Sequence, residues 1–264
     1  MRARRIAVGL ALCALAACAT SPLGRRQLKL FPESQMAQMG LAAFDKMKQD
    51  VPQSHDRRTN GYVDCVAAAI VAELPGAERS GWQVVVFEDT SANAFALPGK
   101  RIGVHTGLLT VAKNQDQLAT VIGHEVGHVM AGHSNERVSQ AFATETGLQL
   151  AQALSGAASP TQRQLIGLLG VGAEFGILLP YSRVQETEAD LVGLDLMARA
   201  GFQPEESVRL WINMGEASRG QPPEFLSTHP SHETRMRELR NRMPSATKLY
   251  ESARTGGKRP ACSR

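Results

Sequence analysis

His124-Glu125-Val126-Gly127-His128 is the stretch that decides how this chain folds and what it can do. Residues four apart share one face of a helix, so the two histidines can present their imidazoles to one zinc ion. Glu125 follows the first of them and can reach a water at the metal as a general base. The alternative is a buried glutamate between two buried histidines without a metal, which would be costly. We therefore expect a catalytic zinc site here.

The flanking sequence predicts that this helix is buried. Apolar residues surround the histidines on most sides between positions 118 and 130, which is typical of a core helix. Asn114 and Gln117 are spaced as a capping box at its start. Gly123 and Gly127 each cost about 1 kcal/mol of helix propensity relative to alanine, and we expect them to permit close approach of another helix.

A catalytic zinc ion needs a third protein ligand. The longer motif that places a third histidine six residues after His128 fails, because Ser134 stands there and His133 is one residue out of register. A glutamate on a later helix is the alternative, and Glu186 is the candidate.

That later helix is predicted to begin with a capping box at residues 182–185. Glu186 and Asp190 lie four apart on one face, so Glu186 can bind zinc while Asp190 accepts a hydrogen bond from a ligating imidazole. Glu188 points elsewhere and is expected to be solvated or paired. The alternative for all three is an ordinary charged helix face.

Elsewhere, the spacing of apolar residues predicts an α+β chain that is mostly helical, with a small sheet. We expect helices at 34–48 and 62–74, a turn-rich stretch at 50–60, strands at 82–87, 92–97 and 101–105 (the last two as a hairpin), and mainly helix from 114 onward. The most apolar segment, Leu165–Pro180, is short for a transmembrane helix. We interpret it as a buried helix, with a lipid-facing flap as the alternative.

The first 17 residues are predicted to be a removable signal peptide, with a basic start and an apolar stretch too short to span a bilayer. Leu15-Ala16-Ala17-Cys18 resembles a bacterial lipobox, which predicts acylation of Cys18 and a place in the outer membrane facing the periplasm. The alternative is a plain signal peptide and a chance cysteine. Residues 18–33 would then be a polar tether, 34–245 the folded domain and 246–264 a C-terminal tail.

Two cysteines remain once Cys13 leaves with the leader and Cys18 carries lipid. An exported protein meets an oxidising compartment, so we expect a disulfide between Cys65 and Cys262 that ties the tail to an early helix. Two free thiols are the alternative.

Composition and charge exclude several classes of protein. The chain of 264 residues is 43% hydrophobic and 20% charged, which excludes a disordered chain. Three of the 29 basic residues lie in the leader, so the mature chain has 26 basic and 25 acidic residues. A charge near neutrality gives no case for nucleic acid as a partner.

Together these motifs resemble peptidase family M48. The likeness runs from about Gln35 to Arg242 and includes, besides the zinc motifs, the segments 93–99, 106–109 and 228–231. It implies a gluzincin fold with one zinc ion, whose ligands are His124, His128 and Glu186 and whose base is Glu125. It further implies a zinc-dependent endopeptidase that cleaves unfolded or misassembled envelope proteins, close to the small lipoprotein members of the family.

The substrate is expected to bind as an extended strand. The segment Asn93, Ala94, Phe95 and Ala96 forms one arm of the predicted hairpin, and an extended peptide could add to its edge through backbone hydrogen bonds. Such pairing reads little sequence, which suits unfolded protein substrates.

His229 and Arg235 are the candidates for stabilising the oxyanion, because Thr228-His229-Pro230 matches the family pattern and Arg235 follows it. His229 could instead bind zinc as a fourth ligand and hold the enzyme latent. A third reading is a histidine that caps the last helix and an arginine paired with a surface glutamate.

Two other functions stay open on the sequence alone. One is an outer-membrane lipoprotein assembly factor or chaperone with a structural or latent zinc site, although an intact Glu125 argues against it. The other is a latent protease that a partner activates. The expected partners are extended protein substrates, the membrane through the lipid anchor, and the outer-membrane assembly machinery.

Overall fold

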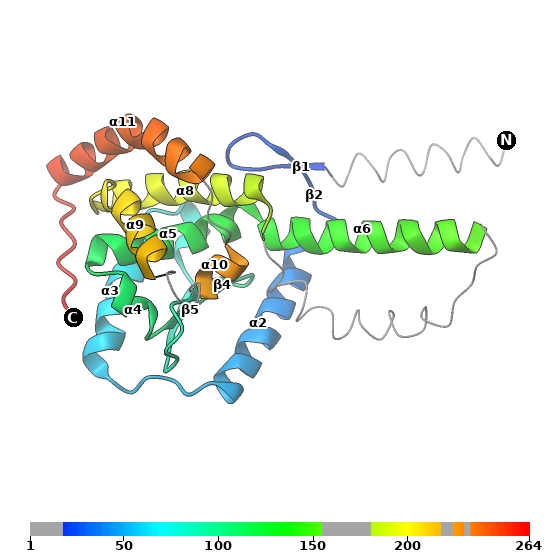
Figure 1. Cartoon of the computed structure of the whole chain (residues 1–264), viewed down its shortest axis with the longest axis horizontal. Coiled ribbons are helices and arrows are strands. Elements are labelled where there is room, and N and C mark those ends of the chain that lie inside the picture. The colour runs from blue at the N-terminus through cyan, green and yellow to red at the C-terminus, as the bar shows by residue number, and fades with distance from the viewer. Residues whose placement is uncertain (1–17, 155–180, 218–223, 230–232) are drawn as a thin grey trace.

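The computed structural model describes residues 18–154, 181–217, 224–229 and 233–264 (Figure 1). They form a mostly helical α+β structure with a three-stranded sheet and a two-stranded ribbon, which confirms the predicted fold class. The predicted signal peptide and the apolar segment Leu165–Pro180 lie outside these residues. Within the described part of the chain, no helix has both the length and the hydropathy needed to cross a membrane.

Two helices form the centre of the molecule. α5 (Gln115–Ala131), which carries the zinc motif, packs along α8 (Arg183–Ala200), where the third ligand was expected. α11 (Glu233–Thr255) packs against α8 in turn and lies above it in Figure 1. α3 (Arg57–Val71) and α9 (Glu206–Ala217) pack against α5, so both central helices are enclosed.

Glycines allow α5 and α8 to touch through their backbones. A Cβ atom on Gly123 would lie 2.9 Å from the carbonyl oxygen of Gly193, and one on Gly127 would lie 2.9 Å from that of Ala189. A Cβ atom on Gly193 would lie 2.6 Å from the backbone nitrogen of His124. This is the close approach that the glycines in the zinc motif predict, and it brings the two sets of candidate ligands together.

The three-stranded sheet supplies the strand next to the site. β4 (Ala94–Leu97) and β5 (Arg101–His105) form the predicted antiparallel hairpin, with Ala96 opposite Ile102. β3 (Gln83–Phe87) pairs with β5 in parallel, so the strand order is β3-β5-β4. β4 is therefore an edge strand of this sheet, and it packs against α5.

The caps of the two central helices differ in detail from the prediction. At α8 the full capping box is present, with Ser182 and Gln185 each bonding the other's backbone. At α5, Asn114 Oδ1 accepts from the Gln117 N–H group at 2.9 Å, but Gln117 Oε1 accepts from the Lys113 N–H group instead of closing the box. The predicted α5 box is thus only half correct.

The N-terminal part is more ordered than the sequence suggests. β1 (Cys18–Thr20) and β2 (Arg26–Leu28) pair antiparallel, so the expected polar tether begins as a two-stranded ribbon, which we call the N-terminal ribbon. It is followed by α2 (Glu33–Asp50), as predicted. The expected turn-rich stretch is also partly wrong, because Asp56 caps the start of α3 and makes residues 57–60 helical.

The remaining elements complete the frame. They are η1 (Gly76–Arg79), α4 (Leu108–Val111), α6 (His133–Leu154) and α10 (Glu224–Thr228). α6 continues from the end of α5 and extends away from the other helices (Figure 1).

The expected C-terminal tail, residues 246–264, begins within α11, so only the residues after Thr255 form a tail, and this tail returns to the domain. A disulfide joins Cys65 in α3 to Cys262, the pairing expected from the sequence. Lys258 forms an ion pair with Glu73 at 2.7 Å, and Gln115 accepts a hydrogen bond from the Cys262 N–H group. The tail therefore lies against α3 and the start of α5.

Candidate metal centre

Four buried side chains meet between α5, α8 and α10. His124 and His128 come from α5, Glu186 from α8, and His229 directly follows α10. One nitrogen or oxygen atom of each lies within 4.8 Å of the others. At most 3% of any of these residues is exposed. The structure thus brings together the three ligands expected from the sequence and His229, which the sequence offered as a fourth ligand.

The spacing of these donor atoms fits a bound zinc ion. The Nε2 atoms of His124 and His128 are 3.0 Å apart, and His229 Nδ1 is 3.2 Å from His124 Nε2. Zinc–nitrogen bonds of about 2.0–2.1 Å in a tetrahedral site place ligand nitrogens about 3.3 Å apart. Glu186 Oε1 lies 3.4 Å from His128 Nε2 and 3.0 Å from His229 Nδ1. Three imidazoles and a carboxylate that converge in this way are a donor set suited to zinc.

The charge states of the donors agree with that role. Burial alone would raise the pKa of Glu186, but hydrogen bonds from His128 and His229 hold that pKa well below its usual value. Burial lowers the pKa of the His128 imidazole far below its usual value. The carboxylate is therefore charged and the imidazole neutral, as metal ligands must be.

Glu125 lies beside the donor set, on the side of the sheet. The residue is 2% exposed, and its Oε2 atom accepts a hydrogen bond from the Ala96 N–H group of β4 at 3.0 Å. Its Oε1 atom is 3.3 Å from His229 Nε2. Burial raises the pKa of the Glu125 carboxyl, which brings it nearer to the value useful for a general base at neutral pH. The segment predicted to receive substrate is therefore in contact with the predicted base.

Asp190 has the contact that the sequence predicts. Its Oδ1 atom lies 2.9 Å from His124 Nδ1. Burial lowers the pKa of His124, but the hydrogen bond and charge of Asp190 outweigh burial and raise that pKa overall. Arg235 in turn donates to both oxygens of Asp190, at 2.6 and 2.7 Å.

Arg235 contacts the carboxylates of the site, and its expected role at the oxyanion stays a prediction. The residue is 1% exposed, its Nη1 atom is 2.7 Å from Glu186 Oε2, and its guanidinium lies 4.0 Å from the Trp211 ring centre. It therefore binds Glu186 and Asp190 at the same time and orients both carboxylates. The alternative of a surface ion pair is wrong, because the arginine is buried.

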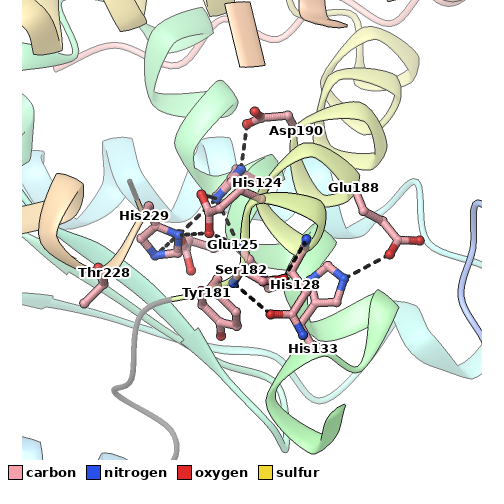
Figure 2. Close-up of polar contacts among 12 residues, drawn as sticks. His124, Glu125, His128, His133, Tyr181, Ser182, Glu188, Asp190, Thr228 and His229 are labelled. Carbon is pink, nitrogen blue, oxygen red and sulfur yellow. Dashed lines mark hydrogen bonds and ion pairs between the residues drawn. The ribbon is translucent and has the colours of Figure 1, made fainter. Parts of the chain in front are cut away.

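His133 and Glu188 also surround the site, although the zinc motifs do not indicate them. His133 Nδ1 lies 2.9 Å from His128 Nδ1, and His133 Nε2 lies 3.2 Å from Glu188 Oε2 (Figure 2). Glu188 is paired, one of the two expectations for it, and is not solvated. Gly132 is the sequence feature that could have indicated the position of His133. Its left-handed backbone (φ 66°) ends α5, so His133 does not continue the helical spacing from His128.

Tyr181 is a second residue that the motifs do not reveal. Its ring stacks on His128, with ring centres 3.7 Å apart. The guanidinium of Arg137 lies 3.6 Å from the centre of the Tyr181 ring. The Tyr181 hydroxyl is 3.3 Å from Ser134 Oγ. This stack fixes the plane of the His128 ring.

A cavity of about 450 Å³ lies beside His128. Its walls include Met36 of α2, Trp82, Met130 of α5 and the β4–β5 turn at Pro98. The lining is more apolar than polar, so the cavity can take an apolar side chain next to the metal centre.

Comparison with known proteins finds metallopeptidases that are similar to this chain. The sequence profile described as Peptidase family M48 matches residues 57–243, which include all four clustered residues. Mitochondrial metalloendopeptidase OMA1 of Schizosaccharomyces pombe is 35% identical over 219 residues, which are 80% of this chain and 63% of that protein. The Beta-barrel assembly-enhancing protease of Yersinia pestis is 30% identical over 212 residues, which are 77% of this chain and 43% of that protein. The chain thus spans less than two thirds of the length of these relatives.

Proposed function

The chain belongs to peptidase family M48, and on that basis we propose that it is a zinc-dependent endopeptidase of the bacterial cell envelope that cleaves unfolded or misassembled proteins. One observation carries the proposal. Donor atoms of the buried residues His124, His128 and Glu186 lie within 4.8 Å of one another, and the Glu125 carboxylate lies beside them next to an edge strand. A purely structural metal site has no use for such a base.

The chemistry follows from this arrangement. A bound zinc ion would polarise a peptide carbonyl and acidify a water molecule. Glu125 would take a proton from the attacking water and pass it to the leaving amine, because its buried carboxylate lies next to the ligands. Asp190 and Arg235 keep His124 and Glu186 in place while the proton moves.

The edge of β4 is the proposed site for the substrate backbone. The Ala96 N–H group points away from β5 and donates to Glu125 Oε2 at 3.0 Å. An extended substrate that pairs with this edge would take over the Ala96 N–H group and release the Glu125 carboxylate for catalysis. The cavity beside His128 would receive a flanking apolar side chain.

A latent form of the same enzyme is the second candidate. His229 Nδ1 lies 3.0 Å from Glu186 Oε1 and 3.2 Å from His124 Nε2, which makes it a fourth donor in a set that a catalytic zinc ion would leave open. His229 would have to leave this position before a water or substrate could enter.

Hydrolysis of casein tests the function. We expect zinc-dependent cleavage that Glu125→Gln abolishes, both in the wild-type background and in a His229→Ala background, while zinc stays bound. The surface change Glu88→Gln removes the same charge outside the site and should leave cleavage unaltered. Bound zinc without Glu125-dependent cleavage in either background would favour an assembly factor or chaperone instead.

The cellular location is part of the proposal. The Leu15–Cys18 motif supports acylation of Cys18 and an outer-membrane position facing the periplasm. Similarity to the Yersinia protein supports an interaction with the outer-membrane assembly machinery. Other relatives are mitochondrial by name. Cys18→Ala should leave an uncleaved or soluble species, and continued lipid labelling of that variant would refute the assignment.

A further inference from the structure

The two histidines of the zinc motif are each supported from behind. His124 Nδ1 contacts Asp190, which Arg235 holds. His128 Nδ1 contacts a different group, the Nδ1 atom of His133 at 2.9 Å. Both outer nitrogens are thus engaged inside the protein, as is usual for ligating histidines.

The direction of the hydrogen bonds behind His128 follows from their partners. His128 Nε2 faces the other donors, 3.0 Å from His124 Nε2, so its proton must be on Nδ1 when Nε2 binds a metal. That proton is donated to His133 Nδ1, which leaves the His133 proton on Nε2. His133 Nε2 can then donate to Glu188 Oε2, 3.2 Å away. Each hydrogen bond from His128 through His133 to Glu188 therefore has one donor and one acceptor.

Glu188 is held by the N-terminal ribbon. Arg25 Nε donates to Glu188 Oε2 at 3.0 Å, and the Leu23 N–H group approaches Glu188 Oε1 at 3.4 Å. The two Nη atoms of Arg25 bind both oxygens of Glu136 at 2.5 and 2.6 Å. Because Glu188 and Glu136 are both buried, each needs this charge.

We propose that Arg25 is a positioning residue of the metal centre, which acts through Glu188 and His133 to fix the orientation and the proton position of His128. The inference rests on the proposed function, since it requires that His128 binds a metal. The N-terminal ribbon is then part of the site, in the same way as α11 contributes Arg235 to the His124 side. Neither the zinc motif nor its spacing indicates a residue so far upstream.

Zinc affinity, measured on the full chain by competition with a chelator, tests the proposal without any protease assay. Arg25→Gln should weaken zinc binding about tenfold, the lower end of the effect of losing outer support for a ligand. Arg26→Gln makes the same change in charge at the next residue of the ribbon, where the side chain is exposed, and should leave zinc affinity unchanged. Arg25→Lys keeps the charge but cannot reach both carboxylates, so it should give a smaller loss.

A double-mutant cycle separates positioning from simple stabilisation of the fold. His133→Asn keeps a polar atom near His128 but is too short to reach Glu188, so it interrupts the chain. Arg25→Gln should lower the melting temperature equally in the wild-type and His133→Asn backgrounds. In the His133→Asn background it should no longer change zinc affinity. The absorption spectrum of the cobalt-substituted protein should shift with Arg25→Gln and not with Arg26→Gln.

Three results would overturn the inference. They are an unchanged zinc affinity in Arg25→Gln, an equal loss of affinity with and without His133→Asn, and an equal loss in Arg26→Gln. If the wild-type chain binds no zinc at all, the proposed function fails together with this inference. If it binds zinc and Arg25→Gln has no effect, only this inference fails.

Discussion

Each carboxylate at the metal centre has a separate task that is set by its partners. Glu186 is held charged by His128 and His229, Asp190 by Arg235 and His124, and burial raises the pKa of Glu125. The first two are thereby suited to bind and orient, whereas Glu125 is suited to accept a proton near neutral pH. The division resembles that of other enzymes in which environment separates two acids of the same type.

His229 is the residue whose role is easiest to reverse by mutation. Because its Nδ1 atom lies among the donors, 3.0 Å from Glu186 and 3.2 Å from His124, we expect His229→Ala to open the site and raise casein hydrolysis while zinc stays bound. Steady-state rates normalised to zinc content measure the change. A fall in turnover of about 10²–10³-fold with zinc retained would contradict the latch and assign His229 to the oxyanion.

At the same scale, spacing along one helix made part of the site predictable. His124, His128, Glu186 and Asp190 are pairs at i and i+4, so the sequence alone brings each pair to one face. His133 could not be read in this way, because Gly132 breaks the helical register between it and His128. The position of Arg25 depends on how the chain returns to α8 from 163 residues away, which no local pattern contains.

At the scale of elements, the contact between α5 and α8 sets the geometry of the site. α8 carries Glu186 and Asp190, and α5 carries the two histidines, so the distance between the helix axes decides whether the donors meet. Gly123, Gly127 and Gly193 make that distance short.

Gly193→Ala should therefore damage the metal centre without altering any polar group. Its Cβ atom would lie 2.6 Å from the His124 backbone nitrogen, so α8 must move away from α5. We expect a loss of about 1–3 kcal/mol in the free energy of unfolding, as in other overpacked sites, and weaker zinc binding. Denaturant unfolding and chelator competition measure the two effects.

The matched control for that change is Gly215→Ala in α9. Nothing lies within 4 Å of a Cβ atom at Gly215, so the same substitution should be neutral or should stabilise the helix by up to about 1 kcal/mol. Equal zinc affinity in Gly193→Ala and the wild-type protein would show that the helix contact does not set the donor positions.

Of the two strand pairings in the three-stranded sheet, the sequence pattern predicts one and not the other. The β4–β5 hairpin was readable from its Pro98-Gly99-Lys100 turn, where Gly99 (φ 84°) and Lys100 (φ 65°) take left-handed backbone. The parallel pairing of β3 with β5 was not, because it joins strands that are not neighbours in the sequence. The N-terminal ribbon was missed for a related reason, since its stability comes from Arg25 and Gln27 contacting α6 and α8 rather than from an apolar pattern.

At the scale of the whole molecule, the Cys65–Cys262 disulfide closes a loop of 197 residues that contains the entire metal centre. Replacing both cysteines by serine should lower the free energy of unfolding by about 2–5 kcal/mol, because the unfolded chain regains freedom. Zinc affinity should change little, since the tail stays docked through Lys258 and Gln115. Guanidinium unfolding tests this, and free alkylation of both thiols in native protein purified without reductant would contradict it.

The metal content of two matched variants shows whether His124, His128 and Glu186 hold one zinc ion. Glu186→Gln and Glu188→Gln make the same change two residues apart on α8, where both carboxylates are buried. We expect one zinc per chain in the wild-type protein and in Glu188→Gln, where only the outer support of His128 is weakened, and almost none in folded Glu186→Gln. Full zinc content in Glu186→Gln together with its loss in Glu188→Gln would contradict this and would show that Glu188 is the ligand.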